Sequence, residues 1–536
     1  MQFHRESRHG DYDAIVVGSG LGGLTAAALL AHTGRRVLVV ERHDRVGGYA
    51  HAFRRRRYRF DSAVHVVGGC DESGLEGPGL VDRVLRAVGA RERCEFVRLD
   101  PFYEADYPGL RLTVPGGLEA FVAAHASAFP AEEKGLRRLV QLCVDLRREA
   151  ERAPDPSFVS DLVRLRKLYP TLVRHHRATL AQVMGESIAD PRLAAVFATL
   201  WPFLGLPPAR VSFLYWATML TSYAADGAFY CRGTFQRLAD ALARGLEEAG
   251  GELLLRSPVR RILVSDGRVR GIVLENGQRI EAPLVISNAD ARQTFEELVG
   301  AEHLPPAFLP KLRRMRPSVS AFVVYCASTI DPRSHGLAHE SFCFPSWDHD
   351  AHFRSTETGA PGWLTITTPT QADPALAPAG EHLYILTTLV SHRSAHGWRE
   401  EKGPMTERLL ALAERRVPGL RASLTFVEAG TPRTMERYTR NTAGAIYGWD
   451  LAPDQVGPGR LPSLSPVTGL ALAGHWTRPG GGIYGVVTSG VETARRVSGL
   501  PASELLAPRT PRRTGSAASA PARPAPPAGV PAAESA

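Results

Sequence analysis

The sequence predicts an α/β fold with two domains, each assembled from segments that are not contiguous in the chain. A short apolar strand, a glycine-rich turn and a helix open the chain at residues 14–30. The same succession of strand, glycine turn and helix returns at residues 470–497. Between them, segments with the helical period alternate with short strand-like runs, a pattern typical of sheets covered by helices.

Length and composition indicate the broad class of the chain. It has 536 residues, of which 44% are hydrophobic and 22% charged, as in globular proteins with a core. The length corresponds to about three to four domains' worth of chain. No run of 18 uncharged apolar residues occurs, and the polar first residues lack the pattern of a secretory signal. We therefore expect a cytoplasmic protein without a spanning helix.

The basic charge and the cysteines exclude several functions. The formal net charge of +9 is carried almost wholly by arginine, and no nucleic-acid-binding motif accompanies it. We expect no nucleic-acid partner. The six cysteines are scattered, without a CxxC pair or a cysteine/histidine cluster. This favours a reducing compartment and predicts neither a metal site nor a disulfide framework.

The first glycine turn lies in the context that a dinucleotide-binding motif requires. An apolar strand at residues 13–17 leads directly into GSGLGG at residues 18–23, and residues 24–31 favour a helix. A second apolar strand at residues 37–40 ends in Glu41. The strand, the helix, the second strand and the acid together make the motif far more specific than three glycines alone.

Each conserved position of such a motif has a physical task. Gly18 makes the tight turn, Gly20 lets the backbone approach a pyrophosphate, and Gly23 lets the helix pack closely on the strand. The helix N-terminus then faces the phosphates. Glu41 is expected to accept hydrogen bonds from the ribose hydroxyls.

The residues after Glu41 distinguish between two dinucleotides. The stretch ERHDRVGG, with its Gly47-Gly48 pair, resembles the FAD-binding Rossmann motif, in which a second glycine pair follows the acidic residue. A plain NAD dehydrogenase usually lacks that pair. We therefore expect FAD, bound by Gly18, Ser19, Gly20, Leu21, Gly22, Gly23, Glu41, Arg42, Gly47 and Gly48.

The middle of the chain adds a segment found in two-domain flavoproteins. Residues 234–250 have one apolar helical face, and the short strands that follow are punctuated by the turns Asp266-Gly267 and Asn276-Gly277. Similarity to those flavoproteins implies that the segment completes the FAD domain and that the Val259 backbone lies against the adenine.

The second glycine turn, GHWTRPGGGIYG at residues 474–485, precedes a helix expected at residues 485–497. Its helix N-terminus would stabilise the negative charge that collects at the pyrimidine edge of a reduced flavin. We expect the two turns to hold opposite ends of one FAD. The contacts predicted from the second turn are Gly474, Gly481, Gly482 and Ile483.

Taken in order, these stretches resemble the phytoene desaturase-like flavoproteins, especially the branch with carotenoid isomerases and retinol saturases. The matching stretches, which also include YRFDSAVHVVGG, a segment ending in ISNAD and EAGTPRTMERYTRNTAGAIYG, span residues 11–500. The resemblance implies a Rossmann-type FAD-binding domain, an α+β substrate or lid domain, and a lipophilic polyene or isoprenoid substrate. It does not imply one reaction, because members desaturate, saturate or isomerise. Ala63 and Arg232 replace glycines that are frequent in the family.

The expected domains follow from the resemblance and from the order of the elements. The discontinuous FAD-binding domain comprises residues 11–75, 227–300 and 425–500, and the substrate-binding domain comprises residues 76–226 and 301–424. Residues 507–536, rich in proline and alanine, are expected to be a disordered tail. Aromatic residues between 194 and 230 could line a substrate tunnel, although most could equally be ordinary core.

Candidates for proton transfer lie in the motifs expected to face the flavin. They are Asp61, His65, His475, Thr477 and Tyr484. For each, orientation of the flavin or local packing is the alternative. These motifs contain no lysine, which lowers the expectation of amine-oxidase chemistry. NAD(P)H is a candidate transient electron donor, since no second complete dinucleotide motif occurs.

Two alternative functions and one surface remain open at this point. The chain could be an FAD amine or amino-acid oxidase, or a non-catalytic prenyl-lipid binding protein like the Rab GDP-dissociation inhibitors. The run FRRRRYR at residues 53–59 could contact anionic lipid headgroups at the inner membrane surface, or it could be a solvated loop. A peripheral membrane contact is therefore an expectation to be tested.

Overall fold

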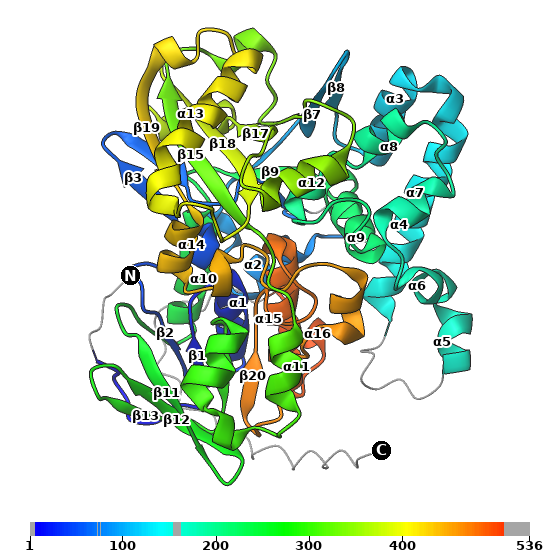
Figure 1. Ribbon diagram of the computed structural model, residues 1–536. Coiled ribbons are helices and arrows are strands. Elements are labelled where there is room, and N and C mark those ends of the chain that lie inside the picture. Colours follow the sequence, from blue (N-terminus) through cyan, green and yellow to red (C-terminus); the bar gives the residue numbers. More distant parts are fainter. Residues whose placement is uncertain (1–5, 72, 76, 154–161, 509–536) are drawn as a thin grey trace.

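The computed structural model describes residues 6–71, 73–75, 77–153 and 162–508 (Figure 1). The predicted disordered tail therefore lies, from residue 509 on, outside the described residues.

A five-stranded parallel sheet lies at the centre of the lower half of the molecule (Figure 1). Its strands, in spatial order, are β10 (Glu252–Leu254), β2 (Val37–Val40), β1 (Ala14–Val17), β14 (Val285–Ser287) and β20 (Leu470–Leu472). All five strands are buried along their whole length. This explains why their sequences are continuous apolar runs rather than alternating ones.

Helices cover one face of this sheet. Helix α1 (Leu21–His32) packs against α15 (Gly482–Ser498) and α10 (Gln236–Glu248). From residue 21 to residue 31 every residue of α1 is buried, so the helix is apolar on all sides. The predicted α/β class with a Rossmann-type sheet is confirmed.

A small antiparallel sheet adjoins the parallel one. It consists of β11 (Val259–Ser265), β12 (Arg268–Leu274) and β13 (Arg279–Glu281). The turns predicted at Asp266-Gly267 and Asn276-Gly277 join these strands, and Asp266, Gly267 and Gly277 have positive φ.

The upper half contains a seven-stranded mixed sheet. Its order is β19 (Leu424–Gly430), β15 (Ser320–Ser328), β18 (His382–Val390), β17 (Leu364–Thr367), β16 (Glu340–Cys343), β7 (Tyr103–Tyr107) and β8 (Leu110–Val114). Among the strand pairs described for this mixed sheet, only β16 and β7 run parallel, and the others are antiparallel. Helices α11 (Phe308–Arg314), α12 (His349–Glu357), α13 (Trp398–Arg416) and α14 (Pro432–Thr439) belong to the same part of the chain. β19 lies in a segment assigned by sequence to the FAD domain, yet it pairs with β15 from Val323 to Ser328 and so belongs to the mixed sheet.

The helices between residues 118 and 224 form a cluster on one side (Figure 1). Its helices are α3 (Leu118–Ala128), α4 (Glu133–Arg152), α5 (Leu162–Leu168), α6 (Pro170–His175), α7 (Leu180–Gly185), α8 (Pro191–Phe197) and α9 (Phe213–Ala224). Two short sheets complete the set of strands. One consists of β3 (Ala52–Arg55) and β4 (Tyr58–Asp61), and the other of β5 (Val67–Gly68), β9 (Ala228–Cys231) and β6 (Phe96–Arg98). Helices α2 (Leu80–Ala87) and α16 (Ala502–Leu505) complete the fold.

Across the described part of the chain, no helix combines the length and apolar character needed to cross a bilayer.

Candidate functional site

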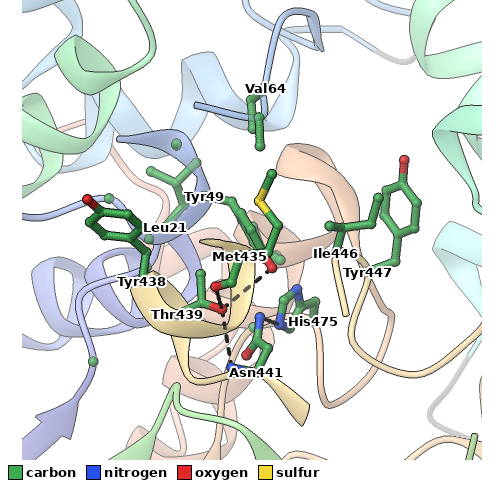
Figure 2. A pocket seen from close by; sticks show the side chains of 18 of the residues that line it. Leu21, Tyr49, Val64, Met435, Tyr438, Thr439, Asn441, Ile446, Tyr447 and His475 are labelled. Carbon is green, nitrogen blue, oxygen red and sulfur yellow. Dashed lines mark hydrogen bonds between the residues drawn. The ribbon is translucent and has the colours of Figure 1, made fainter. Parts of the chain in front are cut away.

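One cavity extends from the carboxyl edge of the parallel sheet to the face of the mixed sheet. At the first end it is lined by the glycine turns and by Glu41, Arg42, Ser257, Pro258 and Val259. At the other end it is lined by Phe203, Ala321, Val323, Glu340, Trp363, Thr365, Thr387 and Leu389. Figure 2 shows the middle, where Met435, Ile446, Tyr447 and His475 surround the space below Val64. The cavity therefore joins a polar, glycine-rich compartment to a largely apolar one.

The first compartment has the form of an anion-binding cradle. Gly18 has φ +91°, which lets the chain turn sharply from β1 into α1. The Gly47 amide donates to the Ser19 carbonyl at 2.9 Å, so the Gly47-Gly48 turn is tied to the first turn. The N-cap residue of α1 is Gly20, which has no side chain to cap the helix, and the first turn contains no acid. Of the leading N–H groups, that of Gly23 donates to the Asn288 side chain, and the helix N-terminus borders the cavity.

The Glu41 carboxylate is held in place by three hydrogen bonds. The Ser19 amide and hydroxyl donate to Oε2 at 2.8 and 2.7 Å, and the His43 amide donates to Oε1 at 2.8 Å. Glu41 is 9% exposed and lines the cavity. Ser19, predicted as a cofactor contact, does not line the cavity, and its two hydrogen bonds orient Glu41.

The two glycine turns lie side by side rather than apart. A Cβ atom on Gly22 would approach the Gly474 Cα and N atoms to 2.8 Å. Asn288, which follows β14, lies between the turns, and its Oδ1 accepts from the Gly23 amide at 3.0 Å. The start of the second turn therefore lies against the first turn, because β1 and β20 flank β14 in one parallel sheet and their carboxyl ends meet at one edge. The expectation that the two turns hold opposite ends of one FAD stays a prediction.

The second turn is supported by a buried cation. Helix α15 begins at Gly482, and no described side chain caps it. Behind the turn, the Arg460 guanidinium donates to the carbonyls of Tyr447 and Thr477, and also to that of His475. Burial lowers the Arg460 pKa to about 10, so the group stays charged at neutral pH. This fixed positive charge and the helix N-terminus both favour a negative ligand group at the turn.

Two predicted candidates for proton transfer, His65 and His475, line the cavity. Burial lowers the pKa of each to about 3, with a further lowering from His339 for His65 and from Arg460 for His475. Asn441 Nδ2 lies 3.3 Å from His475 Nε2 (Figure 2). Both imidazoles are therefore neutral at physiological pH and are poor proton donors.

The other three candidates lie outside the cavity lining. Asp61 ends β4 and accepts from the Tyr230 hydroxyl at 2.6 Å and from the Phe235 amide at 2.7 Å. Thr477 donates to the Leu461 carbonyl at 2.7 Å, and the Tyr484 hydroxyl lies 3.4 Å from Glu151. These bonds favour a structural role for all three.

Replacement of Asp61 by alanine tests this assignment. The change leaves the Tyr230 hydroxyl and the Phe235 amide as buried donors without their acceptor, which we expect to cost about 2–4 kcal/mol of unfolding free energy. Urea unfolding measures it, with Tyr230→Phe as the milder control that removes a single hydroxyl. Unchanged stability combined with lost turnover would contradict the structural role and favour the catalytic one.

The lining can be compared with the predicted cofactor contacts residue by residue. Twelve of the fifteen line the cavity, namely Gly18, Gly20, Leu21, Gly22, Glu41, Arg42, Gly47, Gly48, Val259, Gly474, Gly482 and Ile483. Ser19, Gly23 and Gly481 lie just behind the lining. Sequence analysis missed Asn288, Asn441 and Glu340. The first two stand within matched stretches and could have been found there, whereas Glu340 lies in no motif.

The arrangement suits FAD as a ligand. Two helix N-termini without an acid in their first turns and an acid at the end of β2 match a dinucleotide. Gly20, Gly22 and Gly474 leave no room for a side chain in the cradle, and the apolar compartment leaves space beyond it. These features define the class of FAD-dependent oxidoreductases with a separate substrate compartment.

Comparison with known proteins specifies the family. Residues 21–498 match the family described as flavin containing amine oxidoreductase, and the chain belongs to that family. The family and the cradle together identify the protein as a flavoprotein oxidoreductase with FAD as its cofactor.

Named relatives cover most of the chain. A phytoene dehydrogenase of Streptomyces griseus is 33% identical over 506 residues, covering 90% of this chain and 95% of the relative. A chloroplastic prolycopene isomerase of an Oncidium hybrid cultivar is 28% identical, covering 91% and 84%. An all-trans-retinol 13,14-reductase of Macaca fascicularis is 26% identical, covering 86% and 82%. They confirm the predicted resemblance to the phytoene desaturase-like flavoproteins.

Solved structures share the fold at low identity. An oxidoreductase from Methanosarcina mazei has a TM-score of 0.59 at 19% identity, covering 89% of this chain and 99% of its own. Putrescine oxidase has a TM-score of 0.59 at 16% identity, covering 91% and 99%.

Proposed function

We propose that this protein is an FAD-dependent oxidoreductase that desaturates, saturates or isomerises C=C bonds of a lipophilic polyene or isoprenoid. The observation that carries the proposal is the continuous cavity, in which the glycine cradle opens directly onto an apolar compartment. Bound FAD supplies hydride chemistry. A carotenoid- or retinoid-like substrate is supported by the names of the relatives, which are a phytoene dehydrogenase, a prolycopene isomerase and an all-trans-retinol 13,14-reductase.

The chain's own residues bind and position the substrate. Phe203, Trp363 and Leu389 offer the apolar, water-excluding surface that a polyene needs. Tyr447 and Met435 narrow the passage between the compartments (Figure 2). Because His65 and His475 are neutral, the side chains at this passage place little charge against the substrate.

The test of the function is turnover of defined substrates by the holoenzyme. Anaerobic mixing with NADPH, followed by the absorbance of the visible flavin band, distinguishes the two possible directions of electron transfer. Bleaching indicates a reductive or saturating enzyme that takes electrons from a nicotinamide, and an unchanged band indicates that the substrate is the donor. Phytoene, prolycopene and all-trans-retinol are then incubated under the matching conditions, and products are separated by chromatography. A product with altered C=C bonds is expected. Peroxide release from amines, with no polyene converted, would replace the proposal by an amine oxidase.

We further propose peripheral contact with anionic membranes through the β3–β4 hairpin. Arg54, Arg56 and Arg59 are exposed there, while Arg55 and Arg57 form ion pairs with Glu428 and Glu381. Each exposed arginine near an anionic surface contributes about 1 kcal/mol.

Replacing Arg54, Arg56 and Arg59 together by glutamine is expected to weaken binding to phosphatidylserine-containing liposomes by more than about tenfold in a sedimentation assay. The matched control replaces the exposed Arg399, Arg408 and Arg415 of α13 by glutamine. Equal liposome binding by both triple variants would reject the membrane contact.

A further inference from the structure

Glu340 is an acidic side chain buried in the apolar end of the cavity. It begins β16, is 1% exposed and lines the cavity. Among the residues that the structure describes, it forms no ion pair. Burial raises the Glu340 pKa to about 8, so the carboxyl group is mostly protonated at neutral pH.

The contact between Glu340 and Thr367 uses only one of their two O–H groups as a donor. The Thr367 hydroxyl lies 2.9 Å from Oε1 and 3.1 Å from Oε2. The neutral acid and this hydroxyl carry two protons between them, and the pair can use only one internally. Thr367 supplies the hydrogen bonds that the structure shows for Glu340, so the second of these protons can be given to a ligand or a water. A donor left in an apolar environment is costly unless a ligand or a water accepts from it.

Thr387 provides a second polar group on the same face of the sheet. Its Oγ1 is buried and has no hydrogen-bond partner among the described residues, and Thr387 lines the cavity. Thr387 is paired across the sheet with Thr365 of β17, and Thr367, two residues further, is paired with Glu340. Side chains that alternate by two and lie opposite each other share one face. Glu340 on β16 and Thr387 on β18 therefore face the same side of the sheet, with β17 between them.

The surroundings of these groups are apolar or aromatic. Trp363, Phe203 and Leu389 line the same end of the cavity. Tyr223 is close enough for the Glu340 charge to contribute to its raised pKa. In a cavity that accepted only hydrocarbon, the Glu340 and Thr387 oxygens would be left unpaired. Their presence indicates a ligand oxygen.

We propose that Glu340 and Thr387 bind a hydroxyl or carbonyl oxygen of the substrate, so that the enzyme prefers an oxygenated polyene or isoprenoid over the corresponding hydrocarbon. The inference rests on the proposed function and specifies its substrate class. Glu340 donates to the ligand oxygen, and the Thr387 hydroxyl can donate to it or accept from a ligand O–H.

Binding of a matched pair of ligands to the oxidised holoenzyme tests the inference. The probes are all-trans-retinol and the hydrocarbon in which CH3 replaces its CH2OH group, both delivered from cyclodextrin. Bound ligand is separated by gel filtration and quantified by chromatography after extraction. The wild type is expected to bind the alcohol at least about tenfold more tightly than the hydrocarbon. Glu340→Leu is expected to lose this preference, and Glu340→Gln, which keeps a donor, to retain part of it.

A matched control separates binding from general damage. Thr387→Val is expected to weaken alcohol binding severalfold and to leave hydrocarbon binding unchanged. Thr388→Val removes an equally unpartnered buried hydroxyl from the next residue of β18, whose side chain lies on the opposite face, and should change neither affinity. Equal affinities of the wild type for both probes, as when a water satisfies Glu340, would overturn the inference alone. Failure of both probes to bind would reject the proposed function and the inference with it.

Discussion

Replacing Gly22 by alanine is expected to abolish flavin binding. The added Cβ would lie 2.8 Å from the Gly474 Cα and N atoms and 3.0 Å from the Val486 carbonyl oxygen, and all three are backbone atoms. Backbone cannot rotate aside as a side chain can, so the two glycine turns must separate. Because both turns line the cofactor compartment, a shift of a few tenths of an ångström in either misplaces its N–H donors. We expect at least about a hundredfold loss of FAD affinity.

The measurement is the flavin-to-protein ratio of the purified variant, followed by titration of apoprotein with FAD. Gly403→Ala is the matched control, because Gly403 lies within α13 and a Cβ there meets nothing within 4 Å. That control should bind FAD normally, and we expect no gain in stability from helix propensity because Gly403 directly precedes Pro404. Far-UV circular dichroism establishes that Gly22→Ala remains folded. A folded Gly22→Ala protein with full flavin content would contradict the contact between the turns.

Replacing Glu340 by glutamine is expected to stabilise the protein, and the gain should depend on pH. Burial raises the Glu340 pKa from 4.5 to about 8. Below pH 4.5 the carboxyl group is neutral in both states and ionisation adds no cost. Between the two values the unfolded chain ionises while the folded chain keeps its proton, so the free energy of unfolding falls as pH rises. Above about 8 the cost stays constant.

At pH 7 this cost lowers the free energy of unfolding by about 3 kcal/mol. Glutamine removes the cost, but its unpaired buried amide hydrogens offset part of the gain. We expect a net gain of about 1–3 kcal/mol at pH 7 that shrinks toward pH 5. Urea unfolding at the two pH values measures it, and the exposed Glu297→Gln serves as the control. A gain that is the same at both values would show that Glu340 is not neutral in the folded protein. A buried group that reduces stability is typical of a functional site.

The cofactor side of the site could largely be predicted from sequence because its signals are local. The first strand, the glycine turn, the helix, the second strand and Glu41 follow one another within residues 14–41, and the structure places them as expected. Helix starts were less accurate. α1 begins at Leu21 and α15 at Gly482, each three residues before the expected start, because glycines favour neither helix nor strand and hide the boundary.

The substrate side could not be predicted because its signals are distant in the chain. Glu340 in the strand sequence ESFC resembles a solvent-facing charge, and its burial results from pairing of β16 with β7 and β17. Asp61 shows the opposite case. It lies in a matched stretch, yet it does not line the cavity, and its carboxylate accepts hydrogen bonds from Tyr230 and Phe235. Neither outcome follows from spacing.

The order of strands in the parallel sheet has a consequence for synthesis on the ribosome. Gly18 and Glu41 are synthesised long before β20, at Leu470–Leu472, which completes the sheet, and before Gly474, which packs against Gly22. A nascent chain that stops before β20 exposes the apolar edge of β14 and cannot hold FAD. Such late closure of distant contacts slows folding and leaves strand edges open to association. Holdase chaperones and a supply of free FAD at the moment of chain release should therefore govern the yield of active protein.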